Sequence, residues 1–285
     1  MLAASASTLP KGHVLIEPYV FDVIPHGRFD NDGNRFSMPH RHNVGSLTYM
    51  LYGLTDRITV GLIPTFSYRY GTDHAGSSGI GFGDLQLQGQ VRLAQFREGR
   101  AIPTISFVVG ETLPTGRYDR LDRNPSDGAG SGVHTTTLSL YSQYYFWTPN
   151  GRILRTRLDL SYALSDSAHL TDTSVYGTTL GFRGVASPGD SFTADLAFEY
   201  SVSRNWVLAL DIVHSESAST RLRGRDALLT EVRAESGSSR TLYVAPAVEY
   251  NFNANVGVIA GMRLVPDGRN TIATVTPVAA INIVY

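Results

Sequence analysis

Apolar and polar residues alternate along much of this chain, most clearly over residues 80–96. One parity holds Leu85, Leu87, Val91 and Leu93, and the other holds Asp84, Gln86, Gln88, Gln90 and Arg92. A period of two places alternate side chains on opposite faces of a β-strand. Glutamine and charge facing an apolar core would be costly, whereas a polar lumen accepts them. The pattern therefore predicts a strand between lipid and a polar interior.

Similar segments recur along the whole chain. They cover residues 13–24, 42–52, 57–70, 80–96, 101–113, 132–147, 152–164, 190–201, 206–217, 240–251, 256–265 and 271–285. Most are long enough for a tilted membrane strand of about 9–11 residues. The predicted fold class is all-β, a transmembrane antiparallel β-barrel of about 12 strands.

The connections between these segments alternate in length. Short turns are expected at 53–56, 97–100, 148–151, 202–205 and 252–255, and longer connections at 25–41, 71–79, 114–131, 165–189 and 218–239, with 266–270 as a short exception. Outer-membrane barrels have short periplasmic turns and long extracellular loops. We therefore expect both termini in the periplasm, with residues 1–12 as a periplasmic tail and 13–285 as a single barrel domain.

The last segment carries a second sign of an outer-membrane barrel. Residues 271–285 alternate and end on Tyr285, and chains that end in this way resemble bacterial outer-membrane barrels, in which the final strand is the assembly signal. Other aromatic residues gather near predicted strand ends, as in membrane girdles. These are Tyr52, Tyr68, Tyr70, Tyr144, Phe146, Tyr200, Trp206 and Tyr250. The expected partners are membrane lipid, lipopolysaccharide and the outer-membrane assembly machinery.

The amino-acid composition is consistent with a transmembrane barrel. The chain has 285 residues, no Cys and a formal net charge of −1, so nucleic acid is not an expected partner. No run of about 18 apolar residues predicts a spanning helix. Residues 1–7 lack the basic and apolar regions of a signal peptide and are interpreted as the start of a mature chain or a cleavage-site remnant. A soluble β-sandwich is the main alternative, but its strands are usually about 5–6 residues long.

Several short motifs resemble one family of outer-membrane proteins. They are residues 52–57, Gly83-Asp84-Leu85-Gln86-Leu87, Leu113-Pro114-Thr115-Gly116, and 188–190 together with Glu199-Tyr200 and Asn205-Trp206. The family is named for the MetA pathway of phenol degradation and is described as containing transporters. The resemblance implies passage of small, hydrophobic or aromatic compounds and supplies no catalytic residues.

Charged and amide side chains on the polar parity are the candidate lumen-lining residues. They are Arg69, Asp84, Gln86, Gln88, Gln90, Arg92, Arg155, Arg157, Asp159, Asp195, Glu199, Asp211, Glu249 and Arg263. They could form opposed acidic and basic walls that orient polar solutes. They could equally be paired charges that fill a narrow barrel, and we favour pairing for most. Asp195, Glu199, Asp211 and Glu249 would form an acidic wall unless an arginine reaches across.

Catalytic and metal sites are not predicted. His214 and Ser142 share the lipid-facing parity but lie on distant segments, so a serine–histidine pair cannot form. Residues 30–34 only partly match a calcium loop, and His26, His40 and His42 lack a fourth zinc ligand. We therefore expect no enzyme activity, cofactor or metal. The predicted function is passive passage of small molecules, with a non-conducting scaffold as the alternative and an outer-membrane hydrolase as a third.

A gate is predicted in the connection 165–189. Its apolar centre includes Val175, Tyr176, Leu180 and Phe182, followed by Arg183. Irregular backbone at membrane depth must lie within the lumen. We expect this segment to fold over or into the outer opening and to pack on inward aromatics such as Tyr141 and Tyr243. The alternative is a hairpin that extends the two flanking strands above the membrane.

Overall fold

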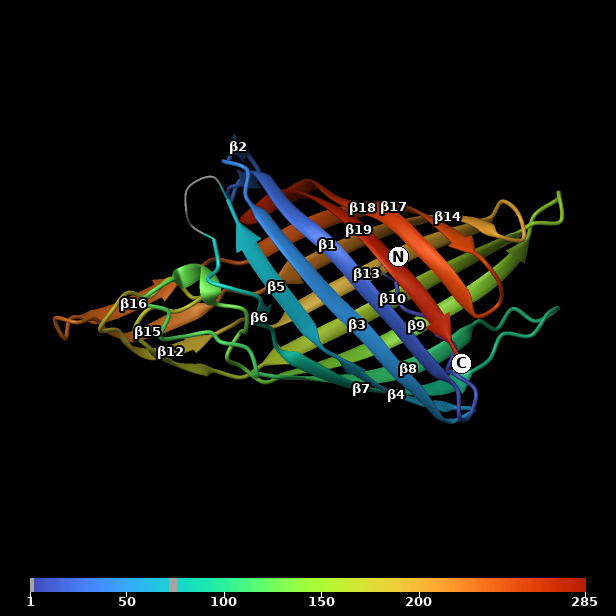
Figure 1. Cartoon of the computed structure of the whole chain (residues 1–285), viewed down its shortest axis with the longest axis horizontal. Coiled ribbons are helices and arrows are strands. Elements are labelled where there is room, and N and C mark those ends of the chain that lie inside the picture. Colours follow the sequence, from blue (N-terminus) through green and yellow to red (C-terminus); the bar gives the residue numbers. More distant parts are fainter. Residues whose placement is uncertain (1–2, 72–75) are drawn as a thin grey trace.

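The barrel wall is one continuous antiparallel sheet. The computed structural model describes residues 3–71 and 76–285. Its first strand, β1 (Val14–Phe29), pairs with β3 (His42–Thr55) on one side and with the last strand, β19 (Thr271–Val284), on the other. These two pairings close the sheet into a barrel of twelve wall strands (Figure 1). The predicted fold class and strand count are confirmed.

Nine further wall strands complete the barrel, two of them broken into parts. They are β4 (Ile58–Ile63) with β5 (Thr65–Tyr70), β6 (Gly81–Phe82) with β7 (Leu85–Ala94), β8 (Thr104–Leu113), β9 (Thr135–Trp147), β10 (Ile153–Ser165), β13 (Ser191–Ser201), β14 (Trp206–Ser217), β17 (Ser239–Asn251) and β18 (Val256–Arg269). Pro64 separates β4 from β5 because proline has no N–H to donate to the sheet. Each part keeps a partner, since β4 pairs with β7 and β5 with β6.

The two faces of the wall differ as the alternation predicts. On β13, Leu196 is 40% exposed toward the outside, whereas the neighbouring Asp195 is buried inside at 6% exposure. Aromatic residues cluster near the short turns, where the Trp206 and Tyr250 ring centroids lie 4.8 Å apart. This arrangement matches a wall with lipid outside and polar groups inside. Within the described residues, no helix is long and apolar enough to cross a membrane.

A second, four-stranded sheet lies beyond the barrel at the end with the long connections (Figure 1). It contains β11 (Ala168–Thr171), β12 (Arg183–Ser187), β15 (Arg221–Arg225) and β16 (Glu231–Glu235). The interpretation of 165–189 as irregular and of 218–239 as a polar loop is wrong for these strands. They hold only four or five residues each, too few for alternation to stand out against the flanking loops.

Two smaller elements sit in the remaining connections. β2 (Arg35–Ser37) pairs with the end of β1, so part of the predicted loop 25–41 is strand. A short 3₁₀ helix, η1 (Pro125–Asp127), begins in the connection after β8, where the Asn124 side chain accepts from Ser126 N. β18 and β19 are joined at Asn270, whose φ of 49° permits a tight turn.

Candidate functional site

Residues 3–9 run inside the barrel. Ala4 N donates to Asp159 Oδ2 at 2.7 Å, and Gln90 Nε2 donates to Ser5 O at 3.0 Å. Ser106 Oγ donates to the carbonyl of the next residue in this segment. The expectation for residues 1–12 was a tail in the periplasm; the structure places residues 3–9 against the inner wall, and Met1 and Leu2 lie outside the described residues.

The chain enters the lumen from the end with the short turns. Gly12 has a φ of 85° and reverses the chain direction before β1 begins. Gly53 allows this approach, because a Cβ there would lie 2.0 Å from Pro10 O. Leu9 N then donates to Thr59 Oγ1 at 2.9 Å, and Lys11 N donates to Asp56 Oδ1 at 3.0 Å. The segment is therefore held by one turn and by wall strands together.

Sequence reasoning missed several of the residues that hold this segment. Besides Thr59 and Ser106, Gln143 Nε2 donates to Ser7 Oγ at 2.9 Å. All three wall side chains lie on inward-facing positions and are nearly fully buried. Their parity was available from the sequence, and naming every polar residue of the inward parity as a candidate would have included them.

Two arginines share one carboxylate on the inner wall. Arg155 and Glu199 are directly opposed on β10 and β13, and both Arg155 and Arg157 form ion pairs with Glu199. Glu199 and Arg157 are only 3% and 5% exposed. Arg157 also donates to Ala3 O, which connects this network to the N-terminal segment. For these three residues, charge pairing across strands is what the structure shows.

Three aspartates lie beside this network. Asp159 and Asp195 are directly opposed on β10 and β13, and Asp211 on β14 is opposite the residue two positions further along β13. All three are buried, at 6% exposure or less. One oxygen of Asp159 accepts from the N-terminal segment. The predicted acidic wall is thus present in part, with Glu199 neutralised by its arginines.

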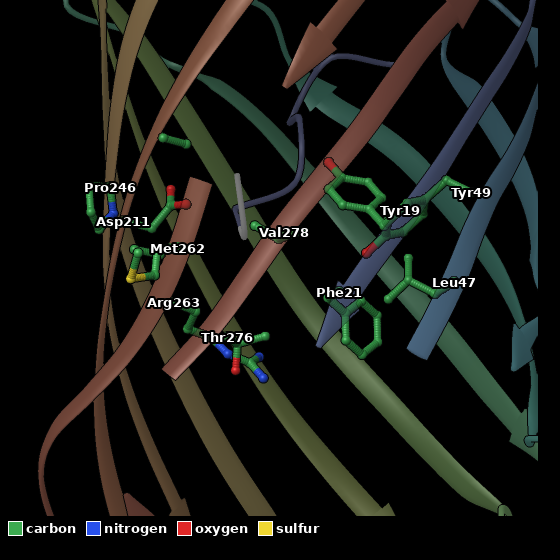
Figure 2. Close-up of a pocket in the computed structure, with 12 residues that line it drawn as sticks. Tyr19, Phe21, Leu47, Tyr49, Asp211, Pro246, Met262, Arg263, Thr276 and Val278 are labelled. Atoms are coloured by element: carbon green, nitrogen blue, oxygen red, sulfur yellow. The ribbon is translucent and has the colours of Figure 1, made fainter. Parts of the chain in front are cut away.

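A cavity of about 140 Å³ opens in the lumen, with Asp211 of this cluster among its lining residues (Figure 2). Tyr19 and Phe21 from β1, with Leu47 and Tyr49 from β3, form an aromatic and apolar side. Figure 2 shows Asp211, Arg263 and Thr276 across the cavity from these residues, beside the apolar Pro246 and Met262. The Arg263 guanidinium lies 5.2 Å from the centroid of the Tyr243 ring, which fixes its orientation. The cavity therefore has one face suited to a ring and one suited to a polar substituent.

Tyr19, Phe21, Leu47 and Tyr49 were not among the predicted lumen residues. Tyr19 and Phe21 alternate along β1, and Leu47 and Tyr49 alternate along β3, so each pair shares one face of its strand. The candidate list was restricted to charged and amide residues, so an aromatic patch within a polar lumen went unnamed.

The polar, partly aromatic lumen inside a lipid-facing barrel agrees with comparisons to known proteins. The family model "Putative MetA-pathway of phenol degradation" matches residues 25–275. The chain belongs to this family. No curated protein sequence matches the chain.

Solved structures support the same fold for this MetA-pathway family member. The crystal structure of an outer membrane channel from Pseudomonas putida F1 is similar over 100% of both chains, with 16% sequence identity and a TM-score of 0.75. The β domain of the Bordetella autotransporter BrkA is similar over 96% of this chain and 100% of its own, with 11% identity and a TM-score of 0.52. At these identities the likeness establishes the barrel fold.

In this family member, two predicted lumen residues hold a loop. Asp84 Oδ1 accepts from Gly116 N at 2.9 Å, and Asp84 Oδ2 accepts from Ser131 N at 2.7 Å and Ser131 Oγ at 2.6 Å. Arg69 Nη1 donates to Ser126 O at 3.3 Å. Both ends and the centre of the connection 114–131 are therefore tied to inward-facing charges on β5 and the β6–β7 strand. Among the other candidates, Gln86, Gln88, Arg92, Glu249 and Arg263 are partly buried on the inner face.

The predicted gate segment forms the β11–β12 hairpin. Phe182 is 2% exposed and lies over two glycines, since a Cβ at Gly184 or Gly224 would be 2.7 or 2.5 Å from its Cζ. Its apolar cluster includes Tyr118, Leu222 and Val232 from other loops rather than Tyr141 and Tyr243. The hairpin alternative thus describes its secondary structure, while gating stays a prediction.

The remaining gate candidates divide into buried and exposed residues. Tyr176 Oη donates to Ser131 O at 2.6 Å, and burial raises the pKa of Tyr176 to about 12. Val175 and Leu180 are 40% and 65% exposed, and Arg183 is exposed. Tyr176 therefore joins the hairpin to the loop that Asp84 anchors.

Backbone hydrogen bonds join these two loops further. Arg120 N donates to Thr171 O at 3.1 Å, and Leu121 N donates to Thr173 O at 2.9 Å. Val175 N donates to Tyr118 O at 2.9 Å. The long connections therefore form one packed unit at their end of the barrel.

His214 and Ser142, the serine–histidine pair considered from the sequence, lie apart in the structure. His214 Nε2 lies 3.0 Å from Glu216 Oε1 on the outer face of β14, while Ser142 on β9 lies opposite residues of β8 and β10. Among the residues that the structure describes, no three His, Cys, Asp or Glu side chains are grouped to hold a metal ion.

Proposed function

We propose that this protein is an outer-membrane channel for the passive passage of small molecules, including small aromatic compounds. The cavity carries the proposal, because it lies in the lumen and combines an aromatic side with a polar side. The family description names phenol degradation, and the similar structure from Pseudomonas putida F1 is named a channel. Both support this class of function over a hydrolase.

The size of the cavity favours a single ring. An engineered protein cavity of about 150 Å³ binds benzene, and this cavity measures about 140 Å³. The rings of Tyr19 and Tyr49 would contact the solute ring. Arg263 would bind a carboxylate or hydroxyl substituent, and Asp211 would accept a hydrogen bond from a hydroxyl. A phenol or a hydroxylated benzoate has both parts.

Passage requires movement at the end with the short turns. Residues 3–9 lie along the lumen with at least one wall contact on β4, β7, β8, β9 and β10. We propose that this end faces the periplasm, that the long loops face outward, and that the β-signal strand β19 is used by the assembly machinery. The N-terminal segment then limits flow from the periplasmic side.

Planar-bilayer recording tests the channel proposal. The complete chain should show low or intermittent conductance, and a variant lacking residues 1–9 should conduct several-fold more, because about seven residues leave the lumen. Ser106→Ala should give a smaller increase, since it removes one contact to the segment. Heat-modifiable migration on electrophoresis should verify that each barrel is folded.

Absence of conductance in all three folded proteins would contradict the channel proposal. It would favour the alternative of a non-conducting scaffold that acts through its loops.

Solute binding in the cavity is tested by the block of ion current by phenol and 4-hydroxybenzoate. Arg263→Gln should weaken block by 4-hydroxybenzoate roughly tenfold, because a hydrogen bond to a charged group contributes about 1.5–3 kcal/mol. Arg92→Gln, an inward arginine that does not line the cavity, is the matched control. Equal block of the ion current in both variants would show that the solute does not bind at Arg263 in the cavity.

A further inference from the structure

Arginines gather on the exposed face of the four-stranded outer sheet. Arg221, Arg223 and Arg225 alternate along β15 and all face solvent. In the register of the sheet, Arg225 is directly opposite Arg183 on β12, and Arg223 is directly opposite Arg233 on β16. The other face of the same sheet carries the apolar cluster that packs on the loops. The sheet therefore has one buried apolar face and one basic face.

Two of these arginines form ion pairs and three do not, although Arg225 is directly opposite Glu231 in the register of β15 and β16. Arg221 lies 3.5 Å from Glu235, and Arg233 lies 2.6 Å from Glu231. For Arg183, Arg223 and Arg225, no ion pair with any other described residue is present. Like charges that are directly opposed across a sheet are destabilising. The arrangement keeps positive charge in place at a cost in stability, which an external anion would offset.

The spacing of the three arginines suits a surface of several anions. Opposed side chains start about 5 Å apart across the strands, and alternate residues on one strand are about 7 Å apart. Guanidinium groups bind phosphate oxygens in bidentate geometry. The three arginines are exposed and line neither of the two described cavities, so an array of phosphates fits better than one enclosed ion.

We propose that Arg183, Arg223 and Arg225 bind the phosphate groups of lipopolysaccharide in the outer leaflet. The outer sheet lies beyond the wall at the end with the long loops (Figure 1), where a barrel in the proposed orientation meets lipopolysaccharide headgroups. Clusters of basic residues next to a membrane-spanning segment recognise anionic headgroups in the same way. This inference rests on the proposed orientation and is independent of solute passage.

Binding to deep-rough lipopolysaccharide tests the proposal. At low salt without magnesium, the triple variant Arg183→Gln, Arg223→Gln, Arg225→Gln should bind at least about tenfold more weakly than the original chain. Each arginine near an anionic surface adds to the binding affinity, and this variant lacks three of them. The control triple Arg97→Gln, Arg100→Gln, Arg152→Gln removes the same charge from exposed residues in the short turns and should bind normally. Dephosphorylated lipopolysaccharide should bind the original chain as weakly as it binds the first variant.

Three results would overturn the proposal. They are equal binding by the two triple variants, binding that survives dephosphorylation, and displacement by millimolar inorganic phosphate, which would indicate a site for a free anion. A triple Arg→Lys variant at positions 183, 223 and 225 should bind with intermediate affinity, because charge is kept while bidentate geometry is lost. Intermediate binding by the lysine variant would show that the glutamine variant binds weakly because it cannot hold phosphate, and not because the outer sheet has unfolded.

The orientation is tested separately. The chain has no Cys, and Leu228 at the tip of the β15–β16 hairpin is 85% exposed. A single Leu228→Cys change should react with a membrane-impermeant maleimide on intact cells. Lack of labelling in the intact cell, with labelling after lysis, would overturn the proposal through its orientation and leave the conductance experiments valid.

Discussion

Apolar and polar residues alternate in both the barrel wall and the outer sheet, but the exposed face is apolar in the wall and polar in the outer sheet. On β10, Leu158 is 42% exposed to the outside and Asp159 is buried in the lumen. On β15, Leu222 packs on the apolar cluster beneath the sheet and Arg223 is exposed. A period of two specifies that a strand has two different faces, and the surrounding solvent decides which of them is exposed. The inversion marks where lipid gives way to water along one continuous chain.

The exposed face changes from apolar to polar between β10 and β11. β10 ends at Ser165 and β11 begins at Ala168. On the neighbouring connection, a Cβ at Gly189 would lie 2.4 Å from the backbone of Ala218, so the two strands leaving the wall approach closely there. Gly189 permits this close approach because it has no Cβ.

The largest expected change is in the free energy of unfolding, and it distinguishes a buried ion pair from an exposed one. Glu199→Gln removes the carboxylate shared by two arginines and should lower the free energy of unfolding by about 3–5 kcal/mol, because buried charge is left unpaired. Glu231→Gln breaks the exposed pair of the outer sheet and should change it by at most about 1 kcal/mol. Urea unfolding in detergent micelles measures both. Equal losses would mean that the lumen network is solvated.

The second prediction compares an added charge on the outward face of the barrel wall with one on the exposed face of the outer sheet. Leu196→Arg places charge against lipid and should destabilise the barrel by about 2–4 kcal/mol at the membrane centre. His169→Arg adds an arginine to the exposed face of β11 and should change stability by no more than about 0.5 kcal/mol. Unfolding in lipid vesicles is the measurement. A tolerated Leu196→Arg would argue against contact between that face and lipid.

The third effect contrasts two glycines. A Cβ at Gly224 would meet Arg183 O at 2.4 Å and the Phe182 ring at 2.5 Å, whereas a Cβ at Gly89 meets nothing within 4 Å. Gly224→Ala should loosen the outer sheet by about 1–3 kcal/mol, as overpacking does. Amide exchange in β12 and β15 should accelerate while the barrel strands stay protected. Gly89→Ala serves as the control and should leave exchange unchanged in both sheets.

The smallest effect concerns the joint between the outer loops. Tyr176→Phe removes the hydrogen bond to Ser131 O and should cost about 0.5–1.5 kcal/mol locally. Amide exchange of residues 116–131 should increase, with no change in the unfolding of the barrel. Tyr162→Phe on the outer face of β10, whose hydroxyl bonds to Asp190 at 3.2 Å, provides a matched control. Faster exchange in both variants would indicate a general loosening instead.

Much of the lumen could be predicted from the sequence, but the partners of its residues could not. Arg155, Arg157 and Glu199 were placed inside because parity is a local property of a strand. Their pairing depends on the register between β10 and β13, and alternation does not specify register. Asp84 was likewise placed inside correctly, yet its partners come from a loop whose path is not periodic.

The sequence by itself determined the barrel, its twelve wall strands and the alternation of two unlike faces along them. These follow from strand periodicity and from connection lengths, which neighbouring residues along the chain specify. Only the tertiary structure decided that residues 3–9 occupy the lumen, that two long connections form a basic sheet, and that aromatic residues of β1 and β3 line a cavity. Those features arise between segments distant in sequence, where close approach, register and packing of non-periodic residues set the outcome.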